Sequence, residues 1–181
     1  MKNDTLKSSL ILFTITAIVG LLLGMMNFYT KDVIKQRAEQ QAEESRKIVL
    51  SGLEYDSETQ TDNIWVYLSS AAGDEEIVGY AIEAAGKGYG GTIRLMVGLD
   101  KDLNVLGVEI LEHTETPGLG DKAQKEVSPQ FIGKQSPFSV VKQNAKNSEV
   151  QAISGATITT KAVVDIVNQA IKLAGNLNQG E

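Results

Sequence analysis

The sequence predicts an α+β protein: a single N-terminal transmembrane helix, then a domain with an antiparallel sheet and packing helices. Residues 8–30 carry no charge, apolar residues alternate with a period of two from residue 64, and a helical period replaces it from residue 162. Strands first and a packing helix last are typical of α+β domains. The predicted organisation is an N-terminal segment and transmembrane helix at 1–30, a juxtamembrane helix and linker at 31–62, and a folded domain at 63–181.

The uncharged segment 8–30 consists mainly of Leu, Ile, Val, Phe and Met. As a helix it spans roughly 33 Å, enough to cross a hydrocarbon core. It is longer than the apolar part of a signal peptide, and a buried core helix of this length usually has a polar face, which this one lacks. The flanking Lys and Arg residues are nearly balanced, with a slight lean toward a cytoplasmic C-terminal side.

Residues 31–50 are rich in Lys, Gln, Glu and Ala and contain no Gly or Pro, so they predict a helix that leaves the membrane. Apolar positions stay sparse until Ile48. We therefore favour a solvated stalk over a partner-binding helix.

Alternating apolar residues then predict strands joined by short turns, and hence a mostly antiparallel sheet. A polar turn at 100–102 separates two such runs and predicts a hairpin. The alternating sets are Ile64, Val66 and Leu68; Val78, Tyr80 and Ile82; Ile93, Leu95, Val97 and Leu99; and Leu106, Val108 and Ile110.

The last segment has a helical period, with one apolar and one polar face. Gly175 is placed where a C′ glycine would end this helix. The apolar face comprises Ala162, Val163, Ile166, Val167, Ala170, Ile171 and Ala174.

Composition excludes several classes of site. The chain has no cysteine and one histidine, His113, so disulfides, cysteine-ligated zinc and ordinary iron–sulfur clusters are absent and haem ligation is poorly supported. The net charge of −6 disfavours binding to nucleic acid. Any redox role therefore requires an organic cofactor.

Three glycine-bearing loops are candidates for a binding site. In Ser154-Gly155-Ala156-Thr157, before the last helix, the hydroxyls either cap the helix or help to seat a phosphate, since a helix N-terminus favours anions. The runs Glu115-Thr116-Pro117-Gly118-Leu119-Gly120 and Gly86-Lys87-Gly88-Tyr89-Gly90-Gly91 are either structural connections or backbone that approaches a flat ligand closely. Neither has the spacing of a phosphate-binding loop.

The order and spacing of Gly88–Ile93, Glu115–Gly120 and Ser154–Thr157 resemble the FMN-binding domain family. Over nearly its whole length the chain resembles the G subunits (RnfG) of the ion-translocating ferredoxin:NAD⁺ oxidoreductase (Rnf) complexes. NqrC, which belongs to the sodium-pumping quinone reductase, is similar in plan, but it is usually longer and has a Gly-Leu-Trp turn at the position of Gly88-Tyr89-Gly90.

This resemblance implies that a flavin transferase moves FMN from FAD onto Thr157 as a phosphoester. The family usually has an aspartate three residues before the motif's serine, where this chain has Gln151. Ring contacts by Leu119 and Tyr89 compete with plain core packing, and His113 is assigned no catalytic role. The residues expected to bind the cofactor are Thr157, Ser154, Gly155, Ala156, Ile158, Thr159, Glu115, Thr116, Gly118, Leu119 and Tyr89.

The implied function is electron transfer through covalent FMN within a redox-driven translocase, without turnover by this chain alone. The implied partners are the membrane subunits that carry iron–sulfur centres and a second flavin. The resemblance also places the domain on the extracytoplasmic side of the cell membrane, and we follow it over the weak lean of the charges. The alternatives are an NqrC-like or free-standing FMN carrier, a membrane-tethered module that binds a ligand noncovalently, and a structural assembly subunit.

Overall fold

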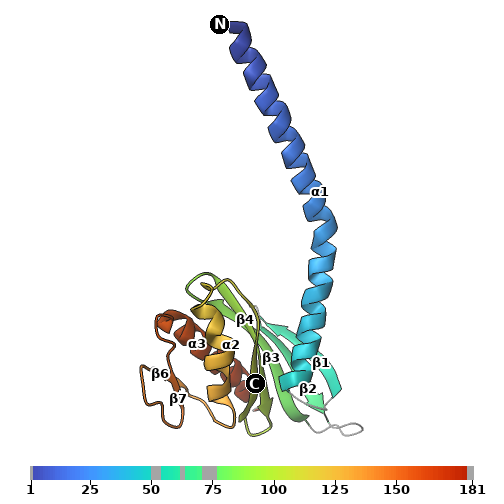
Figure 1. The fold of residues 1–181 in the computed structure, drawn as a ribbon. Coiled ribbons are helices and arrows are strands. Elements are labelled where there is room, and N and C mark those ends of the chain that lie inside the picture. The colour runs from blue at the N-terminus through green and yellow to red at the C-terminus, as the bar shows by residue number, and fades with distance from the viewer. Residues whose placement is uncertain (1, 50–53, 62–63, 71–76, 179–181) are drawn as a thin grey trace. The chain divides into compact units, whose positions relative to one another are not determined.

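The computed structural model describes residues 2–49, 54–61, 64–70 and 77–178. The chain forms two compact units, Met1–Gln41 and Ala42–Glu181. Helix α1 (Lys2–Val49) makes up the first unit and enters the second, and the strands and remaining helices follow it (Figure 1). The predicted fold class is confirmed: a long apolar N-terminal helix precedes an α+β domain with an antiparallel sheet.

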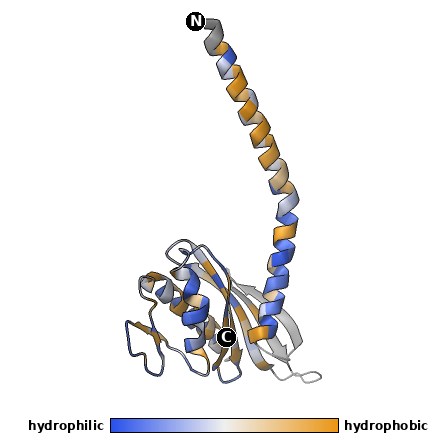
Figure 2. Cartoon of the chain, viewed as in Figure 1, coloured by the Kyte–Doolittle hydropathy of each residue, from blue (hydrophilic) through white to orange (hydrophobic). Residues whose placement is uncertain are grey.

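The N-terminal part of α1 has the composition and length of a membrane span. Its most apolar window has a mean hydropathy of 2.3 and no buried residue. The large apolar side chains from Leu6 to Ile34 are between 48% and 76% exposed. Figure 2 shows this run as an apolar section of the helix, followed by a hydrophilic section.

The main sheet has five strands in sequence order, and each neighbouring pair is antiparallel. Its strands are β1 (Glu54–Thr61), β2 (Ile64–Ser70), β3 (Ile77–Lys87), β4 (Thr92–Asp100) and β5 (Val105–His113). A small parallel pair joins β6 (Ser139–Val141) to β7 (Glu149–Gln151). The other elements are helices α2 (Ala123–Glu126) and α3 (Thr157–Asn178) and two 3₁₀ turns, Gly120–Lys122 and Ser128–Phe131.

Strand β1 lies within residues 31–62, for which the sequence predicts a helix and a linker. It pairs with β2 along its length. Its sequence has no apolar alternation, and this is why the strand was missed. The predicted strand at 64–68 is β2, in which Val66 is buried; the side chains of Ile64 and Leu68 lie outside the described residues.

The predicted hairpin is confirmed as β4 and β5, with one error in phase. Leu106 is 45% exposed, whereas Val105 is fully buried. The register shifts between Gly98 and Leu99, so that Leu99 pairs with Val105. A β-bulge of this kind moves the following residue to the opposite face, and an uninterrupted period of two cannot predict it.

Helix α3 packs against β3 and β4 and closes the main core. The apolar face predicted for this helix is buried, with Val163, Val167 and Ala170 fully covered. The predicted end at Gly175 is wrong, because α3 continues to Asn178. A C′ glycine needs a positive φ, and Gly175 does not have one.

The end of α1 packs against the other face of the sheet. Ala42, Ser45 and Val49 are buried, and Ala42 and Val49 form a second apolar cluster with Ala81 and Met96. The interpretation of 31–50 as a solvated stalk is therefore wrong for its last two turns. This contact depends on glycine, since a Cβ at Gly98 would lie 2.5 Å from the carbonyl oxygen of Val49.

We expect Gly98→Ala to destabilise the domain by about 1–3 kcal/mol, because the added methyl group meets backbone that cannot rotate away. Gly107→Ala is the matched control. Its Cβ would lie 3.3 Å from the Val49 Cα, a contact that a small shift relieves. Thermal unfolding of the detergent-solubilised full chain, followed by circular dichroism, measures both. Equal effects of the two substitutions would contradict the close packing of Val49 against Gly98.

Candidate functional site

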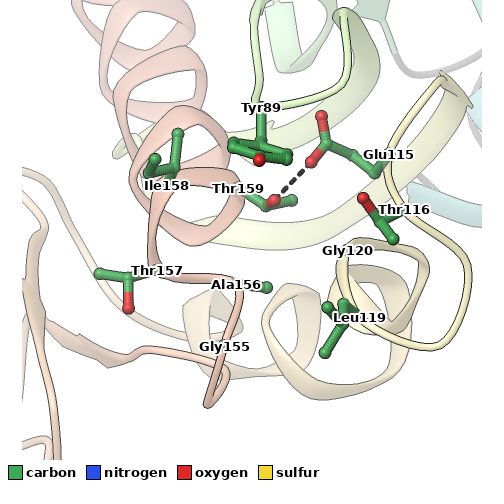
Figure 3. Close-up of a pocket in the computed structure, with 10 residues that line it drawn as sticks. All are labelled: Tyr89, Glu115, Thr116, Leu119, Gly120, Gly155, Ala156, Thr157, Ile158 and Thr159. Atoms are coloured by element: carbon green, nitrogen blue, oxygen red, sulfur yellow. Dashed lines mark hydrogen bonds between the residues drawn. The ribbon is translucent and has the colours of Figure 1, made fainter.

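Three segments far apart in sequence enclose a pocket of about 470 Å³. They are the turn between β3 and β4, the loop after β5, and the start of α3 (Figure 3). Hydroxyl groups, a carboxylate and apolar side chains are mixed in its wall. The lining residues are Tyr89, Glu115, Thr116, Leu119, Gly120, Gly155, Ala156, Thr157, Ile158 and Thr159.

Helix α3 begins at the pocket because the chain turns sharply just before it. Gly155 has φ +80°, a conformation that L residues rarely adopt. Thr160 ties the turn to the helix: its hydroxyl oxygen accepts the amide of Ile153 at 3.2 Å, and the hydroxyl donates to the Ala156 carbonyl at 3.1 Å. The first helical residue is therefore Thr157, exposed at the mouth of the pocket.

Glu115 links all three segments. Its carboxylate accepts the backbone amide of Gly90 at 3.0 Å and the hydroxyl of Thr159, and the backbone amide of Glu115 donates to His113 Nδ1 at 3.3 Å. The side chains of Glu115 and Thr159 point toward each other beside the ring of Tyr89 (Figure 3). Glu115 is 6% exposed and Thr159 is 2% exposed, so this bond is part of the interior wall.

The glycines around Glu115 are needed for close packing. A Cβ at Gly88 would lie 2.2 Å from Glu115 Oε1, and one at Gly120 would lie 2.5 Å from Glu115 Cβ. At Gly90 it would lie 2.2 Å from the backbone oxygen of Thr114. These contacts explain why two glycine-rich runs lie opposite each other at the pocket.

Thr157 also borders a second hollow of about 700 Å³, which is more polar than the first pocket. We call it the outer hollow, and its lining includes Lys142, Gln151 and Ser154. In Figure 3 the Thr157 side chain points away from Tyr89 and Leu119. Its hydroxyl is therefore reachable from outside the first pocket. Gln151 lies in this outer hollow.

Gln124 fixes the chain that leaves the 115–120 loop. Its Oε1 accepts the amide of Ile110 at 2.7 Å, and its Nε2 donates to Glu109 Oε2 at 2.7 Å. Burial raises the pKa of Glu109, and the bond from Gln124 partly opposes this shift. At pH values above this raised pKa, Glu109 is ionised in the folded protein. The buried charge then lowers the free energy of unfolding.

We expect Glu109→Gln to raise the melting temperature modestly at pH 7, because the amide has no charge to desolvate. The gain should shrink as the pH falls through the raised folded-state pKa. It should vanish below the ordinary pKa of glutamate, about 4.3, where the carboxyl is protonated in both states. Melting temperatures from pH 3.5 to 8 check this, and a gain that persists at pH 3.5 would contradict it.

The pocket brings together all the predicted site residues except Ser154 and Gly118. Ser154 lines the outer hollow, and Gly118, at φ +78°, shapes the loop. Gly120 lines the pocket but was left out of the prediction, although it belongs to the same glycine-bearing run. The role of these residues in binding a cofactor remains a prediction.

Comparison with known proteins relates this architecture to flavoproteins. Residues 88–172 match the model of the FMN-binding domain family. The chain is 31% identical to the G subunit of the Na⁺-translocating ferredoxin:NAD⁺ oxidoreductase complex of Acetobacterium woodii, over 96% of this chain and 93% of that one. It is 30% identical to the G subunit of the proton-translocating ferredoxin:NAD⁺ oxidoreductase complex of Clostridium ljungdahlii, over 93% and 91%.

A solved structure shares the fold. The C subunit of the Na⁺-translocating NADH-quinone reductase of Parabacteroides distasonis superposes with a TM-score of 0.58 and 22% identity, covering 79% of this chain and 94% of that one. The identity to the two G subunits extends over nearly the full length of each protein. The chain therefore belongs to the family of G subunits of ion-translocating oxidoreductase complexes, and it contains an FMN-binding domain.

Proposed function

We propose that the chain is a membrane-anchored electron-transfer subunit of an ion-translocating ferredoxin:NAD⁺ oxidoreductase complex, with FMN attached through its phosphate to Thr157. The observation that carries this proposal is the position of Thr157. It is an exposed hydroxyl at the first turn of α3, at the mouth of a pocket formed by the three loops of the FMN-binding domain.

The residues of the pocket fit this cofactor. Its volume of about 470 Å³ lies in the range of small-molecule sites. Three large side chains at the rim are exposed: Tyr89 by 68%, Ile158 by 56% and Leu119 by 40%. The rim therefore has apolar surface for a flat aromatic ring to cover. The start of α3 suits a phosphate, because the first turn of a helix has unpaired amides and a positive dipole end.

In this proposal the protein binds and orients, while FMN supplies the electron-transfer chemistry when it is bound. Thr157 and the neighbouring backbone amides would hold the phosphate. Tyr89, Leu119 and the 115–120 backbone would contact the ring. The chain has no cysteine and thus no thiolate ligands for an iron–sulfur cluster, which leaves an organic cofactor as its electron carrier.

The apolar section of α1 supports anchoring in the membrane, where the other subunits of the complex are the partners. We propose the extracytoplasmic side of the membrane for the domain, as expected from its sequence motifs. A flavin transferase acts on the exposed Thr157 during maturation. Covalent attachment retains the cofactor in a compartment where free flavin would be diluted.

Mass spectrometry of the protein purified from its own membranes in mild detergent tests the proposal. The tryptic peptide 147–161 should carry the mass of FMN less one water, with fragment ions that assign it to Thr157. Iron–sulfur and flavin-bearing membrane proteins should co-purify. An unmodified peptide from a colourless protein would refute covalent attachment, and flavinylated protein without these partners would indicate a free-standing carrier.

A further inference from the structure

The bonds of Glu115 bear on its charge as well as its position. Its carboxylate is buried in the pocket wall, and both of its hydrogen bonds there come from uncharged donors, the Gly90 amide and the Thr159 hydroxyl. Both of its oxygens act as acceptors, Oε1 for the Gly90 amide and Oε2 for the Thr159 hydroxyl, and this is the hydrogen-bonding pattern of an ionised carboxylate. The wall of the pocket therefore contains a fixed anion that the packed glycines hold in place.

We infer that Glu115 sets the reduction potential of the flavin by placing this negative charge at the wall of its pocket. The inference rests on the proposed function, since it requires FMN in the pocket. Reduction brings negative charge into the pocket, and a nearby anion opposes it. Because the carboxylate is buried, water and salt screen it weakly, so its influence exceeds that of a surface charge.

Thr159 moderates the same charge. Its hydroxyl donates to the Glu115 carboxylate, so its positive end partly offsets the field that the carboxylate exerts on the pocket. Removing the hydroxyl at constant volume leaves a stronger negative field. Glu115→Gln and Thr159→Val therefore move the potential in opposite directions. A general loosening of the pocket would move it in the same direction in both.

The test is a redox titration at pH 7, followed by flavin absorbance, of the full-length detergent-solubilised protein from its own host. Glu115→Gln should favour reduction of the flavin. The equilibrium constant for reduction of the flavin by a reduced reference dye should rise about tenfold or more. Thr159→Val should lower this constant. Glu112→Gln is the matched control: it removes the same charge from a side chain that is 65% exposed and lies outside the pocket lining. Its potential should equal that of the unchanged protein.

The possible outcomes separate the two proposals. Flavinylated Glu115→Gln with an unchanged potential would overturn the role of Glu115 and leave the proposed function intact. A shift of equal size in Glu112→Gln, or shifts of the same sign in Glu115→Gln and Thr159→Val, would also overturn it. If Glu115→Gln does not accumulate, Thr159→Val decides: a more negative potential supports the inference, and any other result refutes it. Unchanged protein without flavin would refute the proposed function itself.

Discussion

Replacing Thr157 with alanine is expected to abolish covalent flavin while the domain stays folded. The methyl side chain has no oxygen to form the phosphoester. Loss of a hydroxyl at the start of a helix costs only about 0.5–2 kcal/mol. The unchanged protein should give a fluorescent band at its own mass on a denaturing gel under ultraviolet light, and Thr157→Ala should give none.

Two variants make this result specific. Thr157→Ser restores a hydroxyl at the same backbone position and should recover part of the fluorescence. Ser154→Ala removes the other hydroxyl that borders the outer hollow and should keep the band. Fluorescence that survives in Thr157→Ala would move the attachment site elsewhere in the chain.

Substitution of Arg94 by methionine is expected to cause a large loss of stability. Arg94 Nη2 lies 2.6 Å from Glu83 Oε1, and the side chain of Glu83 is only 5% exposed. Methionine keeps the apolar length of the arginine but leaves a buried carboxylate without this partner. Breaking a buried pair costs about 3–5 kcal/mol, and we expect about 3 kcal/mol because Arg94 itself is 29% exposed.

The same arginine provides the control. Its Nη1 lies 3.1 Å from Glu112 Oε2, and the side chain of Glu112 is 65% exposed. Glu112→Gln breaks only this outer pair, which should cost less than about 1 kcal/mol. Urea unfolding of both variants in detergent measures the difference. Equal losses would mean that the burial of Glu83 does not decide the energetics.

Local patterns predicted the parts of the fold in which one face of an element is buried. The β4–β5 hairpin and the apolar face of α3 follow directly from their periods. Strand β1 could not be found in this way, because it has no apolar alternation and its pairing with β2 is made by the backbone. The packing of residues 42–49 was not predicted for a related reason. Only two small residues and one valine are buried there, and these suffice for packing because the sheet has glycine at 98 and 107.

The candidate site was predicted from short motifs, and their assembly into one site was predicted only from the resemblance to the FMN-binding domain family. Each glycine-bearing run is visible in the sequence, but their convergence depends on the β3–β4 turn and the loop after β5 meeting the start of α3. The central contact joins Glu115 to Thr159, which are 44 positions apart. No local pattern predicts a bond over that separation, so the carboxylate was named as a site residue without its partners.

The packing of Val49 on the sheet determines where the chain can be truncated. A truncated version that begins after residue 49 would uncover Ala81 and Met96, both fully buried, along with Gly98, which Val49 contacts closely. Exposed apolar surface of this kind promotes aggregation. Water-soluble fragments intended for crystallisation or spectroscopy should therefore begin upstream of Ala42 and retain the final turns of the long helix.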